Sequence, residues 1–208
     1  MPIRYHRFAG SSLGRLAALS DGVFAVAMTL LVLDLKVPSA VESERDLLHA
    51  VPHDVAPRLL PYAMSFLTLG IFWVDQQTQL ESFRRSTRAL TWIHLSFLLV
   101  VTLLPFSTAL LAEHTTFRVS MAVYWLNLFA LGLVLFISLS YADRARLIRE
   151  ETTEDMRTAL KRRIVVYQGL YALAALTCLV NTYLALGLLV ALQLNSVIAP
   201  QVGILDRA

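Results

Sequence analysis

Cysteine is nearly absent from this sequence, and enzyme motifs are missing. The one cysteine, Cys178, excludes an internal disulfide, and no metal-ligand spacing surrounds it, so we expect neither a bound metal nor a cofactor. The apolar segments contain no His-Glu-x-x-His or Gly-x-Ser-Gly pattern, and no phosphate-binding loop is present. These absences argue against an enzyme.

Hydrophobic residues are what the sequence has in excess. They make up 57% of the chain, against roughly 45–50% in a soluble domain. They lie in runs of about 20 residues, long enough as helices to cross a hydrocarbon core of about 30 Å. We therefore predict an all-α integral membrane protein whose residues 1–208 form one domain of six transmembrane helices. The predicted spans are 16–36, 59–80, 89–111, 119–141, 161–180 and 183–199, the last two separated at Asn181 and Thr182.

Lysine and arginine are distributed unevenly between the two ends of these predicted helices. The N-terminal segment, the loops after the second and fourth spans and the C-terminus together carry 14 of them, and the opposite loops carry 4. Positive charge collects on the cytoplasmic side of membrane proteins, so we predict that both termini are cytoplasmic. The net charge of +3 has the same origin, and we do not expect a nucleic-acid partner.

The first predicted helix, 16–36, carries the most informative residue, Asp21. A carboxylate is costly inside a membrane and must face protein or water. Asp21 is either a structural anchor held by neighbouring helices or a group that coordinates an ion or relays a proton. A cleavable signal peptide is the rival interpretation of this run, but the run is longer than a signal-peptide core and contains Ser20 and Asp21.

An aliphatic stripe runs along the same helix. Val26, Leu30 and Leu33 follow one another at i, i+4 and i+7 and therefore share a face. Ser20 and Asp21 point about 120–140° away from it, at 100° per residue. Arg15 falls near the stripe at its inner mouth. From spacing alone, packing against other helices is favoured over a central axis as the interpretation of this stripe.

The first helix resembles that of the transmembrane protein 175 family, the lysosomal potassium channels and their bacterial relatives. The family has an Arg, three residues, Phe-Ser-Asp, Gly-Val-Phe-Ala and an aliphatic run ending in an acid, a base and Pro. The matching residues here are Arg15, Ser20–Ala25, Thr29–Asp34 and Lys36–Pro38, with Leu19 in place of the Phe. Similarity continues, more weakly, through Ser65-Phe66, Trp73 and Pro105–Leu111.

This resemblance implies a leak-type, potassium-selective cation channel in a bacterial-type plasma membrane, assembled as a homotetramer. Potassium is then the permeant ion, and membrane lipid surrounds the assembly. The pore would be lined by the first helix, and its hydrophobic constriction or gate by Val26, Leu30 and Leu33, with the Thr29 hydroxyl beside them. The structural polar network behind the pore would comprise Arg15, Ser20, Asp21, Trp73, Trp92 and His94.

Two departures from the family pattern bear on that network. Gln76 and Gln77 stand where the family usually has two histidines, and His94 stands where an Asn is common. We expect His94 or Trp92 to contact Ser20 and Asp21. A proton or small-solute transporter is the alternative function, because Asp21 and His94 are ionisable groups within predicted spans. A membrane protein without transport activity is the third possibility.

Overall fold

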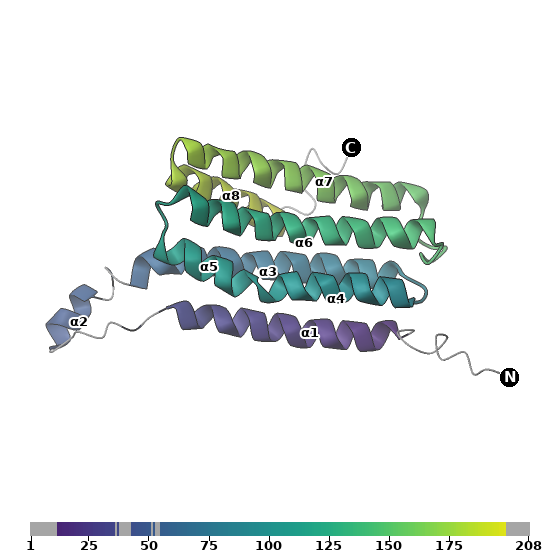
Figure 1. The fold of residues 1–208 in the computed structure, drawn as a ribbon, viewed down its shortest axis with the longest axis horizontal. Helices are drawn as coiled ribbons and strands as arrows, with labels where there is room; N and C mark the ends of the chain where they lie inside the picture. Colours follow the sequence, from purple (N-terminus) through teal and green to yellow (C-terminus); the bar gives the residue numbers. More distant parts are fainter. Residues whose placement is uncertain (1–11, 36, 38–42, 51, 53–54, 199–208) are drawn as a thin grey trace.

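The computed structural model describes residues 12–35, 37, 43–50, 52 and 55–198, and its regular elements are all helical (Figure 1). The elements are α1 (Leu13–Leu30) continued by the 3₁₀ turn η2 (Leu31–Asp34), α2 (Glu44–Ala50), α3 (Ala56–Ser82), α4 (Arg88–Thr102), α5 (Leu104–Glu113), α6 (Arg118–Arg144), α7 (Glu154–Leu176) continued by η4 (Thr177–Leu179), and α8 (Thr182–Ile198). The predicted residues Lys36, Pro38 and Ala199 lie outside the described part of the chain.

Short polar side chains set where several helices begin. Ser12, Thr87 and Thr153 each accept a hydrogen bond from the backbone N–H three residues later, at 3.3 Å, and so cap α1, α4 and α7. Asn181 Oδ1 accepts from the N–H groups of Tyr183 and Leu184 at the start of α8. The apolar stretch therefore breaks at the residues where the sequence places the break.

The third predicted span, 89–111, is divided into two helices at Leu103. Pro105 lies in the first turn of α5 and has no N–H to continue the hydrogen bonding of α4. Leu103 N–H instead donates to the carbonyl of Val100, three residues back, at 3.1 Å. The two helices still form one apolar rod.

Three helical rods in the described residues are long and apolar enough to cross a membrane by themselves: Leu13–Asp34, Arg88–Glu113 and Arg118–Arg144. Of the other helices, α8 is apolar but has only 17 residues. Both α3 and α7 carry more polar residues, and in α3 Ser65, Thr68, Gln76 and Gln79 are buried inside the bundle. A helix with a buried polar face has a lower mean hydropathy than one surrounded by lipid.

The bundle has α6 near its centre and α1 at one edge. The central helix packs on α4, α5 and α7, and buries Leu128, Leu131 and Leu135 completely or almost so. The edge helix α1 packs on α3, α4 and α5. Figure 1 places α7 and α8 at the side of the bundle farthest from α1.

The loops at one end of the bundle are joined to each other. Phe83 and Ile148 form an antiparallel bridge, in which Arg84 N–H donates to the Leu147 carbonyl at 2.8 Å and Arg149 N–H to the Ser82 carbonyl at 2.9 Å. Phe83 and Leu147 also pack with Leu16 of α1 in a small apolar cluster. The start of α1 and the loops after α3 and α6 therefore lie at the same end, as the distribution of basic residues requires, and α2 lies at the other (Figure 1).

A clamp on Asp143 fixes the beginning of α7 against the end of α6. Arg157 Nη1 and Lys161 Nζ donate to the two carboxylate oxygens at 2.9 and 2.6 Å. Hydrogen bonds from Lys161 and Arg157 hold the pKa of Asp143 below its ordinary value of 3.8. Because the pKa is lowered on folding, the clamp stabilises the fold above pH 3.8 and is lost as pH falls through the lowered pKa.

We expect Asp143→Asn to lower the free energy of unfolding by on the order of 1 kcal/mol at neutral pH, since two partly exposed ion pairs are removed. Thermal melting of both proteins in detergent from pH 7 down to pH 3 measures this. The difference between them should shrink toward the acid end, where the wild-type carboxylate becomes protonated. A difference that is constant over the whole range would show that charge is not its cause.

Candidate functional site

The helix α1 has two clearly different faces. Its buried side chains are Leu16, Ser20, Phe24, Ala27 and Leu31, spaced three or four residues apart. This spacing places them along one stripe, which packs against α3, α4 and α5. The opposite face is uncovered in the single chain.

The predicted aliphatic stripe lies on the uncovered face. Val26, Leu30 and Leu33 have 57%, 44% and 71% of their surface exposed. Thr29 is exposed beside them, and its hydroxyl donates to the Val26 carbonyl at 2.8 Å. The donor of Thr29 is therefore used within the helix, while the oxygen lone pairs remain available as acceptors.

A buried polar chain holds α1 from behind. Ser20 Oγ donates to the Leu16 carbonyl at 2.9 Å and accepts from Gln76 Nε2 at 2.9 Å. The same Gln76 nitrogen lies 3.4 Å from His94 Nδ1, and His94 Nε2 lies 3.1 Å from Ser138 Oγ. If the amide nitrogen donates to Nδ1, the ring proton sits on Nε2 and is donated to Ser138. The chain joins α1, α3, α4 and α6 through neutral groups.

Asp21 is held by two donors on α3. Trp73 Nε1 and Gln77 Nε2 both donate to Asp21 Oδ1, at 2.9 and 2.7 Å. Asp21 remains exposed in the single chain, unlike its neighbour Ser20. Ser20 and Asp21 are thus both hydrogen-bonded to α3, with Trp73 as one of the partners, but Ser20 alone of the two is buried in the subunit.

Two residues predicted for this network lie outside it. Trp92 has 60% of its surface exposed, and its carbonyl accepts from Ser96, so the expected contact with Ser20 or Asp21 is wrong for the subunit. Arg15 is also exposed, and its backbone N–H donates to Ser12 Oγ in the cap of α1. His94 does belong to the network, but it reaches Ser20 through Gln76.

The sequence interpretation missed Gln76 and Gln77, which bond Ser20 and Asp21 directly, and Ser138, which bonds His94. The two glutamines are the residues noted as departures from the family histidines, and their amide nitrogens supply hydrogen bonds to Ser20 and Asp21. Their position about one turn after Trp73, where the family usually has histidines, was the available signal. No group of three or more potential metal ligands occurs among the described residues.

A second buried network crosses the bundle further from the joined loops. Thr68 Oγ1 lies 3.0 Å from the Tyr124 hydroxyl and accepts from Gln193 Nε2 at 2.7 Å. Thr108 Oγ1 donates to Ser65 Oγ at 2.7 Å. These bonds join α3, α5, α6 and α8, and all five residues are at most 2% exposed. Buried hydroxyls and amides that are paired in this way fix the register between helices.

The far end of α1 is fixed by Arg58 on α3. Its guanidinium pairs with Glu113 Oε2 at 2.7 Å and lies 3.5 Å from the Asp34 carbonyl at the end of η2. The helix carrying the aliphatic stripe is therefore held at both ends and along its back.

We expect Gln76→Leu to lower the free energy of unfolding by about 1–3 kcal/mol, the cost of leaving buried polar groups such as Ser20 and His94 without a partner. Unfolding in detergent with increasing SDS measures it. Thr78→Val is the matched control, because Thr78 is exposed on the same helix and its hydroxyl donates to the Val74 carbonyl one turn earlier in that helix. Equal losses in the two variants would contradict the assigned role of Gln76.

Comparison with known proteins agrees with this geometry. Residues 15–105 match the family model described as "Endosomal/lysosomal potassium channel TMEM175". A potassium channel of Streptomyces collinus is 42% identical over 124 residues, which cover 58% of this chain and 59% of that protein. A potassium channel of Chamaesiphon minutus is 32% identical over 181 residues, which cover 85% of this chain and 89% of that protein.

The fold is also that of a solved structure. The crystal structure of a lysosomal potassium-selective channel TMEM175 homolog from Chamaesiphon minutus superposes with a TM-score of 0.77 and 28% sequence identity. The match covers 91% of this chain and 98% of that one. Since the fold, the first-helix residues and a relative aligned over most of both lengths agree, the chain belongs to the TMEM175 family of ion channels.

Proposed function

We propose that this chain is one subunit of a leak-type potassium channel, a homotetramer in which α1 surrounds the pore. Family membership and the names of the relatives support potassium as the ion. The observation in this structure that carries the assembly is the exposure of Asp21. Its place five residues after Leu16 puts it about 7.5 Å along the helix, inside the predicted span.

A carboxylate at that depth cannot be left facing lipid. Trp73 and Gln77 both bond one of its two oxygens, Oδ1, and do not cover the residue. The uncovered side of α1 must therefore meet protein or water, and a ring of subunits around an aqueous axis supplies both. This requirement does not apply to the exposed aliphatic residues, which lipid would accept equally well.

The geometry of the upper part of α1 supports the proposed constriction. The helix changes to a 3₁₀ turn at Leu31, and in a 3₁₀ turn residues i and i+3 eclipse. Leu33 is therefore brought over Leu30, closer to alignment than in a straight α-helix. In a tetramer, four copies of each would form two stacked aliphatic rings above a wider ring of Val26. A ring narrower than a hydrated ion opposes passage by the hydration that the ion loses.

The orientation in the membrane follows from charge. The end of the bundle with the joined loops carries the basic residues of the segments 84–88 and 144–163. We assign this end, with both chain termini, to the cytoplasm. The six helical rods would then be the six spans of a multi-pass protein in a bacterial-type plasma membrane.

Ion flux into liposomes made with the purified protein tests the function. We expect a potassium gradient to set the membrane potential, with sodium a poor substitute. Proton uptake without a potassium current would instead favour the alternative, a proton transporter, in which Asp21 or His94 carries the proton. No potassium current under any gradient would remove the channel assignment.

Substitutions on the uncovered face of α1 test the pore. We expect Leu30→Ser to raise ion flux on the order of tenfold, because a polar side chain lets water into the constriction. That factor corresponds to lowering the free-energy barrier to ion passage by about 1.4 kcal/mol. Discrimination of potassium from sodium should weaken in the same variant. Thr29→Ala should change selectivity more than total flux. Currents and reversal potentials measure both, and no change in either variant would show that α1 does not line the pore.

We expect Asp21→Ala to reduce the yield of folded tetramer more than it alters selectivity, because the donors of Trp73 and Gln77 lose their acceptor. Size-exclusion chromatography with light scattering gives the yield, and reversal potentials give the selectivity. Glu81→Ala, an exposed acid on α3, is the control. Normal assembly with lost potassium preference would make Asp21 an ion ligand instead.

A further inference from the structure

A groove of about 530 Å³ opens at the end of the bundle where the loops are joined. It is lined by α4 at Ile93, by α6 between Phe136 and Arg144, and by α7 at Lys161. The lining is apolar at Ile93, Phe136 and Ile137 and becomes polar toward the last turn of α6. An opening of this size is within the usual range for a small-molecule site, and its lining changes from apolar to charged along one direction.

The polar part of the groove lies at the membrane boundary. Arg144 is the last residue of α6 and stands three residues beyond the predicted end of the fourth span at Tyr141. The Tyr141 hydroxyl lies 3.4 Å from the hydroxyl of Thr87, the cap of α4. Lys161 begins the predicted fifth span. Since three helices reach the boundary together here, the charged side chains of the groove lie at the level of the lipid headgroups.

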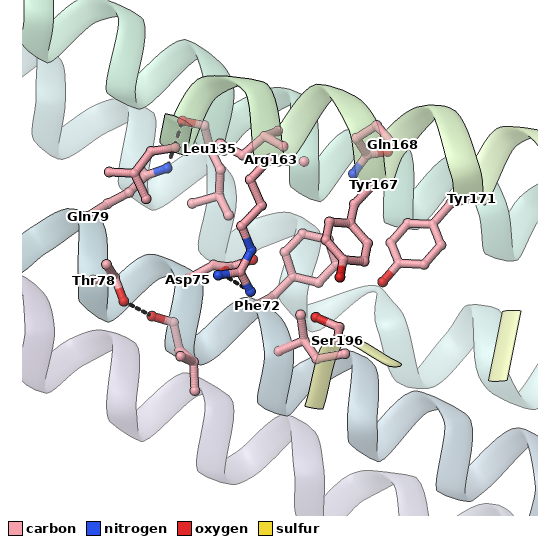
Figure 2. Close-up of a pocket in the computed structure, with 15 residues that line it drawn as sticks. Phe72, Asp75, Thr78, Gln79, Leu135, Arg163, Tyr167, Gln168, Tyr171 and Ser196 are labelled. Carbon is pink, nitrogen blue, oxygen red and sulfur yellow. Dashed lines mark hydrogen bonds and ion pairs between the residues drawn. The ribbon is translucent and has the colours of Figure 1, made fainter. Parts of the chain in front are cut away.

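A different ion pair of α7 lies deeper in the membrane. Figure 2 shows Arg163 extending from α7 to Asp75 on α3, with 3.5 Å between Nη2 and Oδ1. Asp75 lies seven residues before the end of α3, which is about 10 Å along the helix. The Arg163 guanidinium therefore acts below the boundary, and Lys161 is the base of α7 that lines the groove.

The mouth of the groove has a net positive charge. Asp143 is the one acid among the described residues that line it, and it is bonded by Lys161 Nζ at 2.6 Å and by Arg157 Nη1 at 2.9 Å. Arg144 also lines the groove and is exposed, so three bases surround one acid. An ammonium has three N–H donors and a guanidinium has five, so the bonds to Asp143 leave donors for an anion from outside the protein.

An exposed apolar stripe on α6 continues from the groove toward the other end of the bundle. It consists of Ile137, Leu133, Phe129 and Leu126, which are three or four residues apart and have 40–53% of their surface exposed. The stripe is about 16 Å long, close to the depth of one leaflet in a hydrocarbon core of about 30 Å. A soluble anion would leave this stripe uncovered, whereas a molecule with both an anionic group and a hydrocarbon chain fits the groove and the stripe together.

We propose that the groove binds the headgroup of an anionic phospholipid of the cytoplasmic leaflet, such as phosphatidylglycerol. Arg144 and Lys161 bond the phosphate, the hydroxyls of Ser140 and Tyr141 bond the glycerol, and one acyl chain follows the stripe on α6. Phosphatidylcholine has the same phosphate but adds a cation, which the bases at the mouth repel. Basic pockets between helices on the cytoplasmic side are suited to anionic headgroups. The choice of leaflet rests on the orientation in the proposed function.

Native mass spectrometry of the full assembled protein, purified with an equimolar mixture of phosphatidylglycerol and phosphatidylcholine, tests this. We expect the wild type to retain phosphatidylglycerol about tenfold over phosphatidylcholine, which corresponds to about 1.4 kcal/mol. Arg144→Gln should lower this preference about fivefold, which corresponds to about 1 kcal/mol for one base near anionic lipid. Ser140→Phe fills the groove without changing its charge and should lower the retention of phosphatidylglycerol as well.

Arg146→Gln is the matched control, because it removes the same charge two residues later, outside the groove lining, and should leave the preference unchanged. A loss as large as that of Arg144→Gln would show that lipid responds to the total charge of this end, and would overturn the site. Equal retention of the two lipids by the wild type would overturn it too, as would equally tight binding of soluble glycerol phosphate. Lipid counting does not depend on ion flux, so its outcome is separate from that of the channel assignment.

Discussion

The whole arrangement depends on one constraint: inside a membrane, polar side chains must find partners in the protein. Apolar contacts cannot orient a helix there by themselves, because lipid tails accept the same side chains. The orientation of α1 is fixed by Ser20, held by Gln76, and by Asp21, held by Trp73 and Gln77. Helix α3 is the hub, since it also supplies Ser65 and Thr68 to the second network.

Gln76 and Gln77 stand where the family usually has histidines, and this changes how the hydrogen bonds to α1 respond to pH. A glutamine amide donates at any physiological pH, whereas a histidine changes its charge and its donors near neutrality. The amides of Gln76 and Gln77 therefore keep the N–H donors that they offer to α1 at any physiological pH. His94 lies one step further back, between Gln76 and Ser138, and does not contact α1 directly in the hydrogen-bonded chain.

The sequence was sufficient for the helical fold, the grouping of loops at the two ends and the buried position of Ser20, because hydrophobic run length, charge distribution and helical spacing depend on local residues. It was not sufficient for partners on other helices. Trp92 was expected in the network, but its place on α4 turns it outward. The direct role of Gln76 depends on how α3 is rotated against α1, which no single helix specifies. The break at Leu103 could have been read from Pro105.

The two outer sides of the bundle differ in whether their acidic side chain has a basic partner, and this difference orients the subunit. On the α1 side, Asp21 is exposed and its hydrogen-bond donors leave it uncovered. On the side of α7 and α8, Asp75 already has an internal counter-charge in Arg163. The two carboxylates lie at a similar depth, because Asp75 stands between Trp73 and Gln77 on α3, and lipid tolerates one with a counter-charge better than one with neutral donors alone. The α1 side is therefore the one that needs other subunits and water, which is the requirement that a pore at the centre of an assembly satisfies.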